Sequence, residues 1–222
     1  MLSPQTLRWL HRVGYLTTLI VLFEIAGAVW LAFGAWQHSQ QVAAQTREST
    51  RTRVGPFVQS SDPFDPVADN TLFLLAKLPP LKSLSRDSYR FVAMPSFGQR
   101  WFAVSLSNQR GLVSGVLVIA ERNEDGEIGT KVVRRPFAMP PSAYAAMMGK
   151  VDRLSDGWSG ETELWEDGTS VAFERLRGSD ISSGEGNSPT LYGQLAMLIR
   201  NGLSPYVDEV AQLDAAWMVR RH

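Results

Sequence analysis

Four acidic side chains near residue 165 are similar to the paired carboxylates that hydrolyse a glycosidic bond: Glu161, Glu163, Glu166 and Asp167. That reaction uses two carboxyl groups, one as general acid and one as base or nucleophile. Here Glu161 and Glu163 alternate along an expected strand and share one face, while Glu166 and Asp167 precede a glycine, as the residues of a hairpin turn do. We therefore expect a solvated strand face followed by a turn at this position.

The remaining candidate patterns are explained by ordinary structure. Residues 177–188 (RGSDISSGEGNS) precede an expected helix N-terminus, where anions bind, but they match no nucleotide-binding motif, so we expect a loop. Residues 123–127 (NEDGE) are too short for an EF-hand loop and predict a charged hairpin turn. Ser-Lys catalysis has no diagnostic spacing around any of the lysines, which are Lys77, Lys82, Lys131 and Lys150.

The chain contains no cysteine and only three histidines, His11, His38 and His222. Thiolate nucleophiles, disulfides and cysteine-bound zinc are therefore excluded. Two of the histidines flank an apolar segment and the third is the last residue, so the expected folded domain has no internal imidazole. Ser-His-Asp catalysis and the common histidine metal sites need one. We expect no catalytic residue, no metal site and no cofactor, and hence a protein that is not an enzyme.

Residues 15–36 (YLTTLIVLFEIAGAVWLAFGAW) predict a transmembrane helix. At about 1.5 Å per residue they extend over roughly 33 Å, enough to cross the hydrocarbon core of a bilayer. Tyr15 at one end and Trp30 and Trp36 toward the other fit aromatic belts at the two interfaces. The apolar run is longer than the core of a cleaved signal peptide. We therefore expect an uncleaved signal-anchor and a single-pass protein.

Glu24 lies near the middle of this expected span. A carboxyl group in lipid is unfavourable unless it is protonated or paired, so it marks a functional position. On a helix Thr17, Gly27, Ala28 and Ala35 fall on the same face. Small residues around a polar group are typical of helix–helix contacts in membranes. We predict a contact with a partner helix of a second copy or another protein. The alternatives are a protonated glutamate bonded to its own backbone and a proton or ion relay.

The charges around the span predict its orientation. Arg8 and Arg12 lie just before it, whereas the nearest cation after it is Arg47. The positive-inside rule weights the nearer charges, so we expect a cytoplasmic N-terminus and a periplasmic domain. Only four of the 22 basic residues are lysines, a bias common in GC-rich bacterial genomes, which suggests a bacterial inner membrane. In the reverse orientation the arginines at 47, 51 and 53 would face anionic headgroups.

The rest of the chain predicts an α+β domain with a mostly antiparallel sheet and C-terminal helices packed on it. Helices are expected at 66–78 and 141–151 and, capped by Ser188 and Ser204, at the end of the chain. Short β-branched and aromatic runs predict strands over 89–94, 100–107, 112–122 and 128–137. A further hairpin would pair 161–165 with 169–177.

This organisation has four parts. Residues 1–14 form a short basic tail, 15–36 the transmembrane helix, 37–65 a helical stalk and linker, and 66–222 the soluble α+β domain. The stalk should remain helical until Gly55-Pro56, because residues 37–53 contain neither glycine nor proline.

Composition and architecture together favour a binding role over catalysis. Five of the 22 basic but only two of the 22 acidic residues precede Val54, so the soluble part is mildly acidic, which argues against nucleic-acid partners. We expect a non-enzymatic accessory, scaffold or assembly subunit of a bacterial inner-membrane complex, with the lipid bilayer and a membrane-protein partner or second copy as its contacts. The alternative is an extracytoplasmic ligand-sensing or envelope-binding module with a concave pocket. An enzyme using carboxylates or a Ser-Lys pair is the third interpretation.

Overall fold

The computed structural model describes residues 4–57, 66–96, 99–123, 128–161, 168–187 and 190–211. The chain divides into two compact units, Met1–Gln45 and Thr46–His222. We call the second unit the domain and describe each unit by itself.

Helix α1 (Pro4–Thr50, 47 residues) supplies all of the described N-terminal unit and continues for one turn into the domain. From Arg12 to Thr50 it is long and apolar enough to cross a membrane, and its most apolar stretch is not buried at all. Within the described residues it is the one helix with these properties. The prediction that the helix continues past residue 37 is confirmed, but the prediction that it stays helical until Gly55-Pro56 is wrong. α1 ends at Thr50, and residues 53–54 pair with residues 182–183 as a short strand instead.

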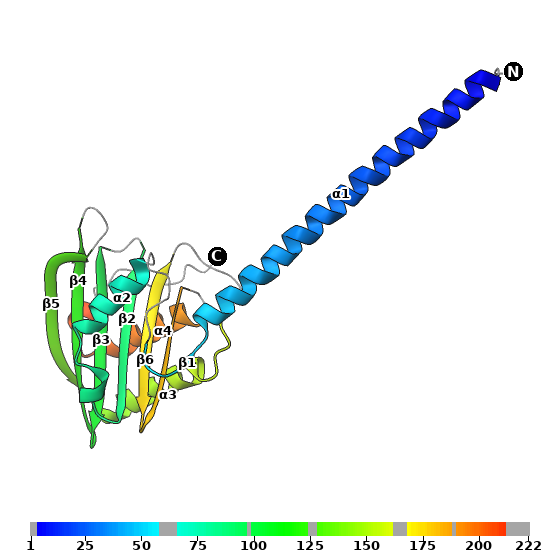
Figure 1. Cartoon of the computed structure of the whole chain (residues 1–222). Helices are drawn as coiled ribbons and strands as arrows, with labels where there is room; N and C mark the ends of the chain where they lie inside the picture. Colours follow the sequence, from blue (N-terminus) through cyan, green and yellow to red (C-terminus); the bar gives the residue numbers. More distant parts are fainter. Residues whose placement is uncertain are drawn as a thin grey trace. The chain divides into compact units, whose positions relative to one another are not determined.

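The domain is built on an antiparallel sheet, which Figure 1 shows with its strands nearly upright. In the described residues the strand order is β1-β7-β6-β2-β3-β4-β5, and each pair of neighbours is antiparallel. The strands are β1 (Arg53–Val54), β2 (Asp87–Pro95), β3 (Arg100–Gln109), β4 (Leu112–Arg122), β5 (Ile128–Met139), β6 (Thr169–Arg177) and β7 (Asp180–Gly186). The predicted α+β fold with a mostly antiparallel sheet is confirmed.

Strands β2 to β5 form a meander whose hairpins follow the sequence signals. The β3–β4 connection is a two-residue turn in which Arg110 and Gly111 have φ of 54° and 81°, as a tight hairpin turn requires. Strands β4 and β5 pair on either side of residues 124–127, so the predicted hairpin there is confirmed. The helices predicted near 66–78 and 141–151 are present as α2 (Pro66–Ala76) and α3 (Pro141–Ser155).

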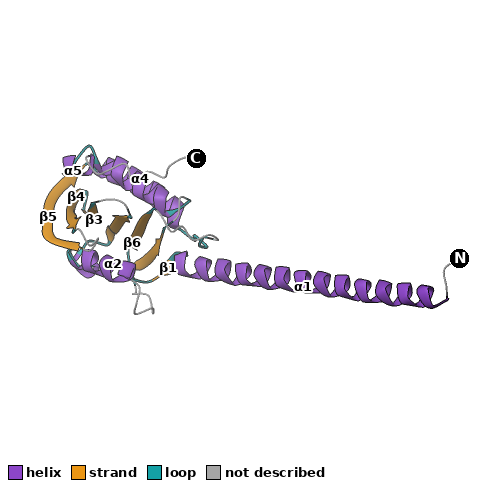
Figure 2. Cartoon of the chain, turned by 90° about the horizontal axis from the view of Figure 1, so that it is seen from above, coloured by secondary structure: helices purple, strands orange, loops and turns teal. Residues whose placement is uncertain are grey.

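Helices cover both faces of the sheet (Figure 2). Helices α3, α4 (Tyr192–Leu203) and α5 (Asp208–Ala211) pack on one face, and α2 packs on the other. Because successive strand residues point to opposite faces, Phe91 and Phe173 contribute to the first core, and Val92 and Ala172 contribute to the second. A short 3-10 helix, η1 (Leu81–Ser83), follows α2. The sheet is therefore a central layer buried on both sides.

The predicted hairpin between 161–165 and 169–177 is wrong. From Val171 to Arg177 both edges of β6 are occupied, one by β2 and the other by β7. The hairpin partner of β6 is β7, which lies in the segment 177–188 that we expected to be a loop. Glycine there leaves room for aromatic rings, because a Cβ at Gly186 would lie 2.4 Å from a ring carbon of Tyr192. The glycines of β7 that made this segment resemble a loop are there because aromatic rings pack against the strand.

The two closing helices begin later than predicted. α4 begins at Tyr192, and its expected N-cap at 188 and first residue at 189 lie outside the described residues. Ser204, expected to cap the last helix, instead ends α4: its amide donates to the carbonyl of Arg200 at 2.9 Å. α5 starts only at Asp208, because residues 204–206 form a turn first.

Candidate functional site

The membrane-helix contact face predicted from the sequence lies on α1. All five of its residues are exposed there: Thr17, Glu24, Gly27, Ala28 and Ala35. The Thr17 hydroxyl donates to the carbonyl oxygen of Val13 at 2.9 Å, so it is satisfied within its own helix. Glu24 is therefore the polar group on this face that a partner helix would have to accommodate.

The spacing of this face has a heptad character. At about 100° per residue, four of the five residues lie within roughly 40° of one another, and Gly27 lies about 60° to the side of Glu24. Apolar residues fill the gaps, so that steps of four and three residues alternate along Thr17, Val21, Glu24, Ala28, Leu31 and Ala35. An average step of 3.5 residues is the repeat of a left-handed helix pair.

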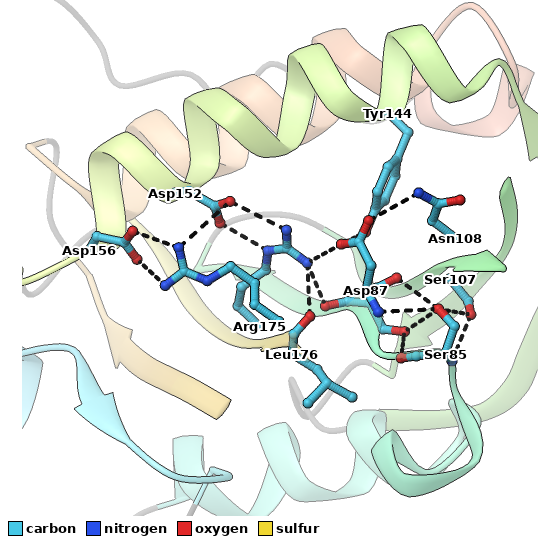
Figure 3. Close-up of polar contacts among 11 residues, drawn as sticks. Ser85, Asp87, Ser107, Asn108, Tyr144, Asp152, Asp156, Arg175 and Leu176 are labelled. Carbon is cyan, nitrogen blue, oxygen red and sulfur yellow. Dashed lines mark hydrogen bonds and ion pairs between the residues drawn. The ribbon is translucent and has the colours of Figure 1, made fainter. Parts of the chain in front are cut away.

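The domain contains a buried polar cluster around Arg175 of β6 (Figure 3). The guanidinium, whose side chain is 5% exposed, donates to two carboxylates. Its Nη1 lies 2.7 Å from Oδ1 of Asp87, and its Nε lies 2.9 Å from Oδ1 of Asp152. Nη2 reaches the second Asp152 oxygen at 3.3 Å, and Nη1 also donates to the carbonyls of Ser88 and Leu176. Each nitrogen of this arginine thus has a partner.

Asp87 gathers further donors at the start of β2. Its Oδ1 accepts from the Tyr144 hydroxyl at 2.9 Å, and its Oδ2 accepts from the Asn108 amide at 3.0 Å. Burial raises the pKa of Asp87, but hydrogen bonds from Arg175, Tyr144 and Asn108 lower that pKa by more, so it lies below its usual range. Burial raises the pKa of Tyr144, and Asp87 adds to this, so the phenol stays protonated and donates. The carboxylate is held ionised.

A second ion pair extends the cluster along α3 and β6. Arg177 donates to both oxygens of Asp156, at 2.7 and 2.8 Å. Its side chain is 42% exposed and that of Asp156 is 44% exposed. Burial lowers the pKa of Arg175, but its hydrogen bonds to Asp152 and Asp87 raise that pKa by more, so it remains a cation. We call the two pairs, Arg175–Asp152 and Arg177–Asp156, the α3–β6 ion-pair ladder. Because its charges are already paired with one another, the role of the ladder is to position α3 on β6.

The opposite face of the sheet carries its own buried pair. Arg90 of β2 donates to Oε2 of Glu174 at 2.6 Å, with side chains 10% and 5% exposed. Arg90 also donates to the carbonyl of Leu75 in α2, and Glu174 accepts from the backbone amide of Phe57 at 2.9 Å. This pair therefore links α2, two strands and the segment after β1. Neither buried arginine was predicted from the sequence. For Arg175 a signal existed, because Asp152 and Asp156 have helical spacing while Arg175 and Arg177 have strand spacing.

The last turn of α1 is held inside the domain. The carbonyl of Thr50 accepts from the Tyr192 hydroxyl, and the Thr50 hydroxyl accepts from the amide of Glu161 at 2.8 Å. The amide of Thr52 donates to the carbonyl of Trp158 at 3.0 Å. Gly160 has φ of +95°, and a Cβ there would lie 2.1 Å from the carbonyl oxygen of Arg47. We call residues 46–57 the strap.

The other sequence candidates have separate positions. Glu161 accepts from the hydroxyl of Thr190, while the predicted acidic residues at 163, 166 and 167 lie outside the described residues. All four lysines are exposed, whereas Ser-Lys catalysis uses a lysine that is desolvated beside its serine. In the described ranges no group of three His, Cys, Asp or Glu is arranged to hold a metal ion. A hollow of about 80 Å³ lies beside Arg53, Phe57 and Glu185.

A scan against protein-family models and searches of curated proteins and solved structures found no significant match to this chain.

Proposed function

We propose that the protein is a single-pass, membrane-anchored and non-enzymatic accessory, scaffold or assembly subunit of a bacterial inner-membrane complex. The observation that carries the proposal is Glu24 within an apolar helix whose most apolar stretch is not buried by the chain itself. A carboxyl group at the centre of a span is unfavourable in lipid and is stabilised by a hydrogen-bonding partner. A partner helix supplies such a group.

The α1 face around Glu24 supports close contact with another helix. Ala28 and Ala35 are small, which lets two backbones approach, and their spacing from Glu24 follows a left-handed pair. Thr17 bonds to its own helix backbone, so it makes no demand on the partner. The partner is a second copy of α1 or a helix of another membrane protein, and Glu24 lies at the contact in both cases.

The domain supports a docking role more than a chemical one. Its buried charges join elements to one another: Arg175 connects β6 to α3 and β2, and Arg90 connects β2 to β6 and α2. Ligand pockets usually enclose about 300–1,000 Å³, and the hollow beside β1 holds about 80 Å³. This hollow among the described residues therefore does not by itself support the ligand-sensing alternative.

Co-purification with a tagged full-length protein tests the proposal. In mild detergent we expect a defined set of membrane proteins, or an untagged second copy, to accompany the wild type and to be lost with Glu24→Ala. Glu24→Gln keeps a hydrogen-bonding group and should retain part of the association, because an interhelical hydrogen bond contributes about 1 kcal/mol. Mass spectrometry identifies other membrane proteins, and a pull-down with two different tags detects a second copy.

Glu48→Ala is the matched control, because Glu48 lies on the same helix beyond the expected span and pairs with Arg51 at 2.8 Å. It should leave the association unchanged. If the wild type and both Glu24 variants run alone as one species, the membrane contact is disproved. Thermal stabilisation of the full chain by a metabolite or glycan would then favour the ligand-sensing alternative.

A further inference from the structure

The strap passes around the edge of the sheet from one face to the other. At its start, Thr50 contacts Tyr192, which belongs to the core beneath α3 and α4. At its end, Phe57 packs with the core beneath α2 and donates its amide to Glu174. Between these points β1 pairs with the outer edge of β7. One short segment thus joins both helical layers of the domain.

The start of the strap is firmly held. Thr50 is 6% exposed, its carbonyl accepts from Tyr192, and its hydroxyl accepts from the amide of Glu161. A helix leaves its last carbonyls without intrahelical partners, so the Tyr192 hydroxyl satisfies a group that would otherwise be unpaired at the end of α1. The Tyr192 ring reaches this position because Gly186 leaves space for it.

The middle of the strap is weakly held. β1 contains two residues, and both side chains are exposed, with Val54 98% exposed. Its contacts with β7 are backbone pairing of Arg53 with Ser183 and of Val54 with Ser182, followed by the Gly55 amide donating to Ile181 at 2.8 Å. Without apolar burial, such an edge strand has little to stabilise it once its ends are released.

We propose that the strap is a releasable clamp, with the Tyr192–Thr50 hydrogen bond as its latch. A pull on α1 enters the domain at Thr46 and reaches Thr50 before it reaches β1, because that is the covalent order of the chain. Once the latch breaks, the load passes to the Thr50–Glu161 and Thr52–Trp158 hydrogen bonds, and their loss frees β1 and uncovers the outer edge of β7, while strands β2 to β6 remain paired. The inference rests on the proposed membrane anchoring only for the source of the pull.

Force spectroscopy on the full chain tests the clamp. The protein has no cysteine, so Gln40→Cys in α1 and Ser179→Cys in the β6–β7 turn provide two specific handles at exposed positions. In detergent we expect a small reversible extension before the large unfolding of the sheet. Twelve strap residues at up to about 3.5 Å each give roughly 40 Å.

Tyr192→Phe removes the hydroxyl and keeps the ring. The small extension should then occur at lower force, with its open state populated about tenfold more, as expected for loss of one hydrogen bond. The large unfolding event should keep its force. Thr50→Val, which removes the acceptor for the Glu161 amide, should act in the same direction. Tyr206→Phe, at a half-buried tyrosine beyond α4, is the control and should change neither event.

Two results would overturn the clamp. In one, the chain extends in a single event, so that the strap and the sheet unfold together. In the other, Tyr192→Phe and Thr50→Val leave the force of the small event unchanged. Neither result depends on a membrane, so failure of the clamp and failure of the Glu24 association are read independently.

Discussion

Arg175 shows how one side chain can join three elements. Replacing it with methionine would leave Asp87 without its cation and Asp152 with only the more distant Arg177, whose Nη1 lies 3.9 Å from Oδ2 of Asp152. Removing one partner of a buried ion pair destabilises a protein by about 3–5 kcal/mol. We expect Arg175→Met to lower the free energy of unfolding by about 3 kcal/mol, since Asp87 is 40% exposed and partly solvated. Urea unfolding of the full chain in detergent measures this.

Arg177→Met is the control for that experiment. Arg177 pairs with Asp156 in the same ladder, but both side chains are more than 40% exposed. Ion pairs of this kind contribute between 0 and about 1 kcal/mol. If both variants lost the same stability, the difference in burial between the two pairs would not matter, contrary to our account.

The depressed pKa of Asp87 predicts a loss of stability in acid. A carboxyl group with a lower pKa in the folded state stabilises the protein above its unfolded pKa, and this contribution is lost as the pH falls through the folded pKa. The unfolded value is about 3.9. We expect the melting temperatures of wild type and Asp87→Asn to differ most above about pH 5 and to converge as the pH falls below the unfolded pKa and through the lower folded pKa. Calorimetry over this range measures it; a gap that stays constant would contradict the linkage.

At this scale, prediction from the sequence depends on how local the environment of a residue is. Glu24 stays a prediction, and it could be made because a carboxyl group within an apolar run is visible in the sequence alone. Arg175 and Asp87 could not be paired, because their contact depends on β6 lying beside β2, 88 residues apart in the chain. The ladder was predictable in part. The spacings of its residues are visible in the sequence, but the packing of α3 on β6 is not.

Among the secondary-structure elements, β7 needs glycine to leave space for aromatic rings that pack against it. We expect Gly186→Ala to destabilise the domain by about 1–3 kcal/mol, because its Cβ would lie 2.4 Å from the Tyr192 ring and force that ring to move. The strap should loosen with it, since Tyr192 holds Thr50. Hydrogen exchange of residues 50–55 and thermal unfolding measure the two effects.

Gly149→Ala is the matched control. Gly149 lies inside α3, and a Cβ there would meet only the Arg153 side chain at 3.7 Å, an ordinary contact. Alanine in a helix interior is more favourable than glycine by up to about 1 kcal/mol. Equal destabilisation by both substitutions would show that the packing against Tyr192 is not the cause.

The elements of the meander were predictable because each hairpin is local and its turn has a short sequence signal. β7 was missed for a physical reason. Strands usually carry β-branched or aromatic residues, but β7 reads DISSGEG, and its glycines make space for Phe173 and Tyr192 from elsewhere in the fold. The composition that indicates a loop and the composition that accommodates a large ring are the same.

For the whole molecule, the proposed topology predicts which cysteines react in intact cells. Ser179→Cys lies in an exposed turn of the domain, and Ser3→Cys precedes α1. With the domain in the periplasm, a membrane-impermeant maleimide should label Cys at 179 in intact cells and Cys at 3 only after permeabilisation. The reverse pattern would place the domain in the cytoplasm, against the positive-inside argument.

At this scale the strap lay beyond sequence-based prediction. Residues 46–57 are polar and arginine-rich, which is typical of a solvated stalk. Their role in the domain arises from Tyr192 and Glu161, which lie 142 and 111 residues away from Thr50. Such contacts depend on how the finished sheet presents its edge, and no local pattern encodes them.

The α3–β6 ion-pair ladder matches the residue spacing of a helix to that of a strand. Aspartates four residues apart on a helix are separated by about 6.0 Å along its axis, and arginines two residues apart on a strand by about 6.6 Å. The two separations nearly agree over one step, and their difference would grow with each further step. Sliding α3 by one turn would leave Arg175 without a carboxylate in one direction and place Asp152 over Phe173 in the other, so either slide keeps only one of the two ion pairs. The ladder therefore favours one position of α3 along β6.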